Sequence, residues 1–141
     1  MTSACPNSSN ARLESIKSVK VIDLPVAIAT YNKAIEWIKS AALLGDRSYA
    51  VEAANTHVAA LARHDAAFGK AMNQFDLITP DGMLLVWAVN RQLNDSEKLT
   101  DRVYGPTLMP KTIATTPAQP EFKHSLLRRK QSTPNQHQTP S

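Results

Sequence analysis

The sequence predicts an α/β domain with a largely parallel sheet and flanking helices. Short apolar runs rich in β-branched residues alternate along the chain with longer stretches of helical periodicity, in the order β, α, β, α, β, α. The chain has 141 residues, of which 43% are hydrophobic, and this leaves room for one domain with a modest core. We therefore expect one sheet built from consecutive strand and helix units.

The first predicted elements are a pair of short strands and a helix. Residues 19–29, VKVIDLPVAIA, contain two short β-branched runs that favour two strands or a small hairpin. Residues 30–45, TYNKAIEWIKSAALLG, place apolar side chains on one face at helical spacing. Thr30 can cap the start of this helix, and Gly45 suits its end.

The middle of the chain continues the alternation. Residues 48–54, SYAVEAA, are apolar enough for a buried strand, and residues 76–79, DLIT, predict another short one. Residues 56–75 have helical spacing, and Asp65 can cap the second part of that stretch. Residues 83–93, MLLVWAVNRQL, predict a further helix. Each later strand is thus followed closely by a helix, which is typical of a parallel sheet.

The two ends of the chain differ in composition from the predicted domain at residues 19–127. Residues 1–18 are rich in Ser and Asn and predict a mobile leader. Residues 128–141, RRKQSTPNQHQTPS, contain no aliphatic side chain, so we expect a disordered basic and polar tail. The single cysteine, Cys5, has no partner for an intrachain disulfide or a zinc site.

Charge and hydropathy exclude several classes of protein. All 12 acidic residues lie at or before Glu121, and 12 of the 16 Lys and Arg precede Lys123. The net charge of +4 therefore comes from Lys123 and the tail, and a neutral body does not predict a nucleic-acid-binding face. No apolar run is long enough for a transmembrane span or a secretory signal. We expect a cytoplasmic protein.

Polar residues follow two of the predicted strands, at the place where ligands gather in an open α/β sheet. Asn55 and His57 lie at the first of these strand-to-helix junctions, and Asp81 lies at the second, between Pro80 and Gly82. A carboxylate in such a turn can take a proton from a substrate hydroxyl, while the amides of the helix N-terminus can bind a diphosphate. His57 can bind a substrate oxygen or carry a proton.

Each candidate residue also has a structural interpretation. Asp81 can be the N-cap of the following helix, and spacing alone favours that role, since Pro-Asp-Gly is a common turn. His57 can be a satisfied polar group at a helix start. Arg102 can neutralise a diphosphate through its planar guanidinium, or it can stand solvated in a loop. The chain has no Asp-x-Asp pair and no histidines at ligand spacing, so we expect no metal and no cofactor.

Two stretches resemble a known family. The run NTHVAALARHDAAFGKAMNQFDLITPDGMLLVWAVNRQL, followed by DRVYGPTLM, is similar to the core signature of the WecG/TagA/CpsF glycosyltransferases. The resemblance extends from about Val19 to Met109, and the Pro-Asp-Gly-Met run combined with the later Arg-Val-x-Gly is its most specific part. It implies a Rossmann-like, mostly parallel sheet with flanking helices that is incomplete relative to the family.

The resemblance also implies a reaction and roles for the candidate residues. Such enzymes move a sugar, often N-acetylmannosamine or its uronic acid and sometimes a hexose, from a uridine diphosphate donor to a sugar on a polyprenyl diphosphate. The products feed cell-surface polysaccharides. Carried over by position, Asp81 is the base for the acceptor hydroxyl, Arg102 stabilises the leaving diphosphate, and Asn55 lies against the donor sugar. The family is regarded as working without a metal.

Two departures from the family pattern qualify this interpretation. Ala53 occupies a position at which members often carry Thr, and the chain is shorter than they are. Residues 121–127, EFKHSLL, resemble the next family strand, which commonly continues into Gly-Gly, whereas this chain continues with Arg128 and Arg129. One hypothesis is a frameshift near Leu127. An alternative to an active enzyme is therefore a non-catalytic, truncated remnant of one.

Overall fold

The computed structural model describes residues 12–116 and 120–127. The elements follow one another as β1 (Ser18–Val21), β2 (Leu24–Ala27), α1 (Tyr31–Leu44), β3 (Val51–Ala54), α2 (Thr56–His64), α3 (Ala66–Met72), β4 (Leu77–Pro80), α4 (Met83–Asn90) and α5 (Gly105–Ala114). The predicted tail at residues 128–141 and most of the predicted leader lie outside the described residues.

The strands form two small sheets. β1 and β2 pair in an antiparallel hairpin, with Val21 opposite Leu24, so the hairpin interpretation of this segment is confirmed. β3 and β4 pair in parallel, with Ala54 opposite Pro80. β2 lies beside β4, so the hairpin packs next to the parallel pair. The predicted α/β class, with parallel strands and flanking helices, is confirmed, whereas the expected single sheet is replaced by two two-stranded sheets.

Local capping explains where the helices begin and end. Thr30 accepts a hydrogen bond from the backbone N–H of Lys33 at the start of α1, and Gly45 ends the helix in the left-handed region at φ 60°. Asp65 separates α2 from α3 because its carboxylate accepts from the N–H of Phe68, at 3.0 Å. The predicted capping roles of all three residues are confirmed.

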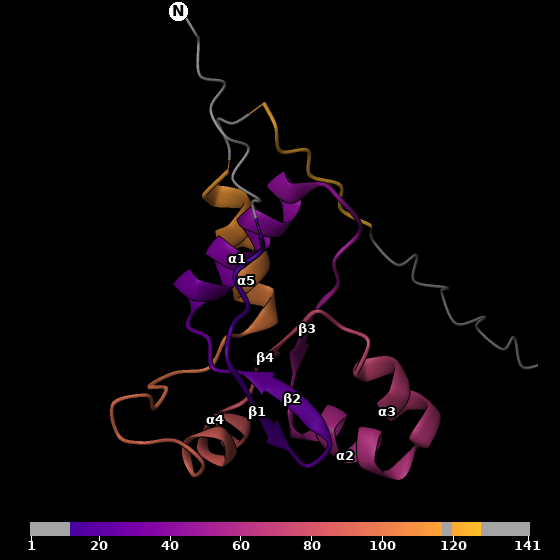
Figure 1. Cartoon of the computed structure of the whole chain (residues 1–141), viewed down its shortest axis with the longest axis vertical. Helices are drawn as coiled ribbons and strands as arrows, with labels where there is room; N and C mark the ends of the chain where they lie inside the picture. The colour runs from indigo at the N-terminus through magenta and orange to yellow at the C-terminus, as the bar shows by residue number, and fades with distance from the viewer. Residues whose placement is uncertain (1–11, 117–119, 128–141) are drawn as a thin grey trace, which may run out of the picture.

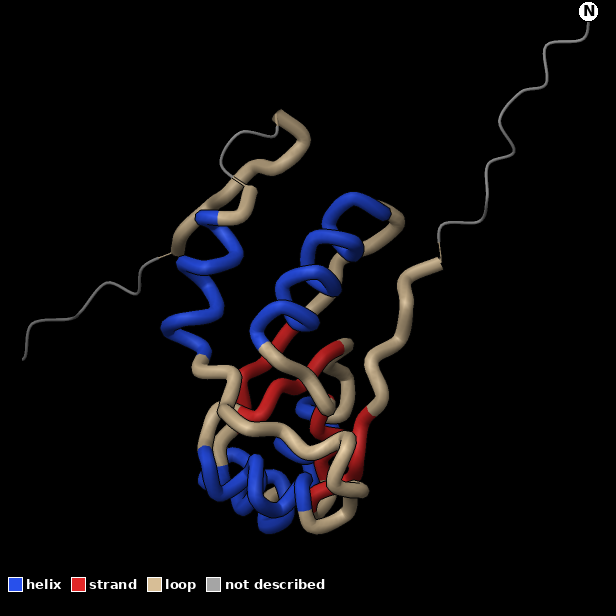
Figure 2. Tube along the Cα trace, turned by 90° about the vertical axis from the view of Figure 1, so that its left-hand side faces the viewer, coloured by secondary structure: helices blue, strands red, loops and turns tan. Residues whose placement is uncertain are grey.

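Helices cover the strands at both ends of the molecule, where α1 and α5 stand side by side and α2, α3 and α4 gather at the opposite end (Figures 1 and 2). Two groups of buried side chains hold this arrangement. The first joins the hairpin to the parallel strands, α2 and α4, and includes Leu24, Val26, Ala54, Ala59, Ile78, Leu85 and Val89. The second joins the strands to α1 and α5, and includes Ala34, Ile35, Trp37, Leu77, Val103 and Leu108.

Several features differ from the sequence expectations or add to them. α5 covers residues to which the sequence assigned no element. Pro106 sits in its first turn, where proline is tolerated, and Pro110 lies inside the helix. Leu13 and Ile16, within the expected leader, pack against the second group of buried residues. Among the described residues, each helix is too short or too polar to cross a bilayer.

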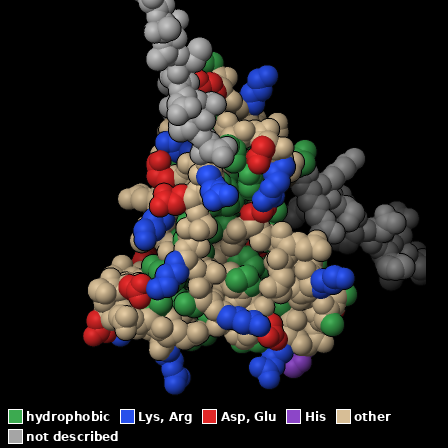
Figure 3. Space-filling model, in the orientation of Figure 1, with side chains coloured by type: hydrophobic (Ala, Val, Ile, Leu, Met, Phe, Trp, Pro, Cys, Tyr) green, Lys and Arg blue, Asp and Glu red, His purple; other side chains and the backbone are tan. Residues whose placement is uncertain are grey.

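The described surface carries mixed charges. On the face shown in Figure 3, Lys and Arg side chains alternate with Asp and Glu. Several are paired, as in the contacts of Lys17 with Glu97 at 2.7 Å and of Arg47 with Asp76 at 2.6 Å. This face therefore lacks a broad field of one sign, in keeping with the neutral body that the sequence predicts.

Candidate active site

The strand-to-helix junctions after β3 and β4 lie together. The backbone N–H of Asp81 donates to the carbonyl oxygen of Ala54, at 2.8 Å, so the parallel ladder continues to the last residue before each turn. Gly82 adjoins Asn55, since a Cβ placed on Gly82 would meet the Asn55 Cβ at 3.9 Å. Asn55 and Asp81, which are 26 positions apart in the sequence, thus share one end of the sheet.

Asp81 does not cap α4. The N-cap position belongs to Gly82, and no side chain bonds to the first turn of the helix. One carboxylate oxygen of Asp81, Oδ1, is buried and has no hydrogen-bond partner within the described part of the chain. An unsatisfied buried carboxylate oxygen is costly and is uncommon outside functional sites. The capping interpretation favoured by spacing is therefore wrong, and the carboxylate is left available for chemistry.

Glu52, a residue that the sequence interpretation did not select, is the second carboxylate near this end of β3. It lies opposite Ile78 in the ladder, and its carbonyl oxygen accepts a hydrogen bond from the Thr79 hydroxyl at 3.4 Å. Burial and the negative charge of Asp81 raise the pKa of the Glu52 carboxyl above its ordinary value. A charged residue inside the apolar run SYAVEAA was the available signal.

Asn55 and His57 occupy the start of α2. Asn55 is its N-cap, and its side-chain oxygen accepts from the N–H of Val58 at 3.0 Å. This bond fixes the amide and leaves its nitrogen as a donor, for which the described residues supply no acceptor. His57 is exposed in the first turn of the helix. Both side chains can therefore reach a ligand at the sheet end without breaking a contact made by the described residues.

Arg102 is brought to the same end of the sheet by a backbone contact. The N–H of Val103 donates to the carbonyl oxygen of Pro80, at 2.7 Å, which fixes this loop beside the residue that precedes Asp81. The guanidinium carbon of Arg102 lies 4.7 Å from the centroid of the Tyr104 ring, in a cation–π contact. Its side chain is exposed, and within the described chain no carboxylate forms an ion pair with it.

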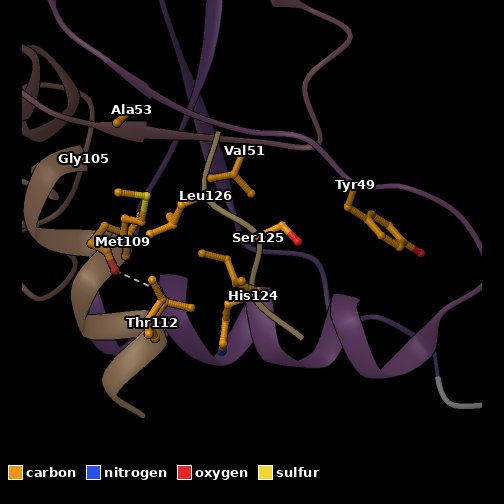
Figure 4. Close-up of a pocket in the computed structure, with 12 residues that line it drawn as sticks. Tyr49, Val51, Ala53, Gly105, Met109, Thr112, His124, Ser125 and Leu126 are labelled. Atoms are coloured by element: carbon orange, nitrogen blue, oxygen red, sulfur yellow. Dashed lines mark hydrogen bonds between the residues drawn. The ribbon is translucent and has the colours of Figure 1, made fainter. Parts of the chain in front are cut away.

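A cavity of about 400 Å³ borders the sheet at Ala53 and Gly105. Figure 4 shows side chains from β3, from α5 and from the extended segment at residues 124–126 around it. The start of α5 approaches β3 closely here, since a Cβ on Gly105 would lie 3.0 Å from the Cβ of Ala53. None of the four predicted site residues lines this cavity or two further ones, of about 670 and 200 Å³. The candidate site is thus an open sheet end.

An α/β domain that presents a free carboxylate beside two helix N-termini has the arrangement of a sugar- or phosphate-handling enzyme. Comparison with protein families matches residues 19–138 to the Glycosyl transferase WecG/TagA/CpsF family. The chain belongs to this family. Its members are glycosyltransferases, and membership implies a nucleotide-sugar donor and a lipid-linked acceptor in general terms. A search of curated proteins found no significant match.

Proposed function

We propose that this protein transfers a sugar, of the N-acetylmannosamine type or a hexose, from a uridine diphosphate sugar to a polyprenyl-diphosphate-linked acceptor. The observation that carries the proposal is the carboxylate of Asp81, with a buried, unpartnered oxygen at the end of β4. The family match supports the reaction class. We place the reaction in cell-surface or exopolysaccharide biosynthesis, in the cytoplasm at the inner face of the membrane.

The proposed chemistry is a direct displacement. Asp81 takes the proton of the acceptor hydroxyl, and the hydroxyl oxygen attacks the anomeric carbon of the donor sugar as the bond to uridine diphosphate breaks. Arg102 stabilises the negative charge of the departing diphosphate, and the free amides at the start of α4 add to this stabilisation. Asn55 donates from its amide nitrogen to the donor sugar, and His57 contacts a substrate oxygen.

The decisive variant is Asp81→Asn, which removes the base and changes the volume of the side chain very little. Since Asp81 does not cap α4, and forms no ion pair with another described residue, the fold should survive the loss of its charge. We expect transfer to fall by roughly a hundredfold or more, the usual contribution of a general base. The melting temperature should not fall below that of the native chain, because the variant also removes the repulsion between Asp81 and Glu52.

Asp65→Asn is the matched control, because Asp65 caps α3 and Asn caps about as well as Asp. Transfer is measured with purified chain, membranes carrying lipid-linked sugars and a panel of radiolabelled uridine diphosphate sugars. The control should transfer at the native rate. Near-native transfer by Asp81→Asn, or no transfer from any donor by the native chain, would contradict the proposal.

A further inference from the structure

α4, the helix that follows Asp81, exposes apolar side chains. Its sequence, MLLVWAVN, contains no charged residue. Leu85, Val86 and Val89 form its buried face, whereas Leu84 and Trp87 are 59% and 58% exposed. Burying large apolar side chains is the main favourable term in folding, so a helix that leaves two of them in water has a second surface available for a partner.

The exposed apolar side chains are followed by a basic one. Leu84 and Trp87 are three residues apart and share a face of the helix. The N–H of Arg91 donates to the carbonyl oxygen of Trp87, at 3.0 Å, so the helical turn continues and places Arg91 on the same stripe. Arg91 is exposed, and within the described residues no carboxylate forms an ion pair with it.

The hairpin lies beside the end of α4. The side chain of Gln92 donates to the carbonyl oxygen of Lys20, at 2.9 Å, and α4 packs against β1. Ile22, in the turn, is 45% exposed and has a φ of 57°. The left-handed region is unfavourable for a β-branched residue, so packing maintains a strained turn that leaves an apolar side chain in water. Lys20 adds a second cation, partly offset by Asp23 at 3.9 Å.

We propose that Leu84, Trp87 and Arg91, here called the α4 surface, dock the protein onto an anionic lipid bilayer, with Lys20 and Ile22 on the neighbouring hairpin. A Trp and aliphatic side chains flanked by Lys and Arg have the composition of an interfacial membrane contact, in which the apolar groups enter the headgroup region and the cations meet lipid phosphates. The charge pattern favours a bilayer over a second copy of the chain, because two copies of this surface would bring their cations together.

The position of the α4 surface also suits the reaction, and to this extent the inference rests on the proposed function. The acceptor carries its sugar on a lipid whose chain stays in the bilayer. Asp81 lies two residues before α4, so docking this helix brings the carboxylate close to the headgroup layer, where that sugar is found. The surface is small, so binding should be modest and should weaken as salt screens the cations.

The test uses the full chain and vesicles of phosphatidylcholine with or without phosphatidylglycerol. We expect cosedimentation with the anionic vesicles and much weaker binding to the neutral ones. The double variant Leu84→Gln, Trp87→Gln should lower the partition coefficient by about tenfold or more, since it removes two apolar anchors. Arg91→Gln should weaken binding only to anionic vesicles. Leu43→Gln is the matched control, since Leu43 is 55% exposed on α1, and its partition coefficient should stay within about twofold of the native value.

Fluorescence gives a second readout that locates the contact. Trp87 is exposed, whereas Trp37, the other tryptophan, is 8% exposed. Brominated lipids should therefore quench Trp87 in the native chain, and Leu84→Gln should reduce the quenching. Absence of binding by the native chain, or equal loss in Leu43→Gln and the double variant, would overturn the inference. A dimer abolished by the double variant would also overturn it, by showing that a second copy covers this surface.

These measurements involve no sugar donor, so they are independent of catalysis. Asp81→Asn should bind vesicles as the native chain does. If vesicle binding fails while Asp81→Asn still abolishes transfer, only the docking surface is wrong. If binding succeeds while Asp81→Asn transfers normally, the proposed catalytic role is wrong and the docking surface stands.

Discussion

The side chain of Asn55 combines a structural and a chemical role at one position. Its oxygen caps α2, and its nitrogen is the proposed donor to the sugar. Asn55→Asp should keep the cap, because Asp and Asn cap equally well and a negative charge is favourable at a helix N-terminus. It removes the amide donor, however. We expect an unchanged melting temperature and a donor affinity reduced about tenfold in calorimetry, the loss of one hydrogen bond.

Asn55→Ala provides the comparison, since it removes both groups. It should weaken donor binding and also lower the free energy of unfolding by about 1 kcal/mol through loss of the cap. Native donor affinity in Asn55→Asp would show that the residue is only a cap. The same pair of variants would then assign the contact with the donor to another group at the sheet end.

At the level of single residues, the sequence predicted positions better than roles. It placed Asp81 after a strand and before a helix, as observed, because strand ends and turns have strong local signals. It could not tell whether Asp81 or Gly82 is the N-cap, since a shift of one residue in the helix start decides this. Glu52 was missed because the causes of its raised pKa, burial and the charge of Asp81, arise only when the folded chain pairs β3 with β4.

At the level of elements, α2 and α3 meet closely at Gly69. A Cβ on Gly69 would lie 2.5 Å from the carbonyl oxygen of Ala62, and backbone cannot rotate away as a flexible side chain can. Gly69→Ala should therefore separate the two helices. We expect it to lower the free energy of unfolding by roughly 1 to 3 kcal/mol, the usual cost of overpacking, as measured by chemical denaturation.

Gly82→Ala is the matched substitution without a clash. The nearest atom to its Cβ would be 3.9 Å away, and its backbone is extended, which Ala adopts freely. This variant should lose only the N-cap preference of Gly over Ala, about 1 kcal/mol or less, and so remain more stable than Gly69→Ala. A destabilised Gly82→Ala together with a stable Gly69→Ala would show that close helix packing is not what requires glycine at position 69.

The elements that the sequence predicted are those with local signals. α1 has Thr30 and Gly45 as caps, and Asp65 marks the break between α2 and α3. α5 was not assigned from the sequence, and a proline inside a segment normally argues against a helix. Tertiary packing overrides that preference, since Leu108 is buried against the strands and α1. The outward face of α4 was also not predictable, because a helix that is apolar all round does not indicate which side is buried.

The molecule as a whole is held by two groups of buried apolar side chains on either side of a short strand layer. The site lies at an end of that layer, where β3 and β4 stop, so the packing that forms the fold also sets the position of Asp81. The ion pairs at the surface, such as those of Lys17, Lys39 and Lys98, contribute little to stability individually. Glu52 is the exception that should be visible in the stability of the whole protein.

Glu52 lowers the stability of the folded state as pH rises above the ordinary pKa of a glutamate. Its pKa in the folded chain is raised by burial and by Asp81, above the ordinary value of about 4.3 expected when unfolded. Between these two pKa values the folded state binds more protons than the unfolded state, so stability falls as pH rises through that window. At pH values above this window, the loss of stability caused by the ionised Glu52 is constant. Glu52→Gln, which resembles the protonated carboxyl, should remove this dependence.

Thermal unfolding of the native chain and of Glu52→Gln from pH 4 to pH 8 tests this expectation. The melting temperatures should coincide near pH 4, and the variant should become the more stable of the two as pH rises. Asp81→Asn should reproduce part of the effect, because it removes the second cause of the raised pKa of Glu52. If Glu52→Gln is less stable than the native chain by the same amount at every pH, the expectation is wrong. That pattern would indicate lost packing and not the removal of a charge near Asp81.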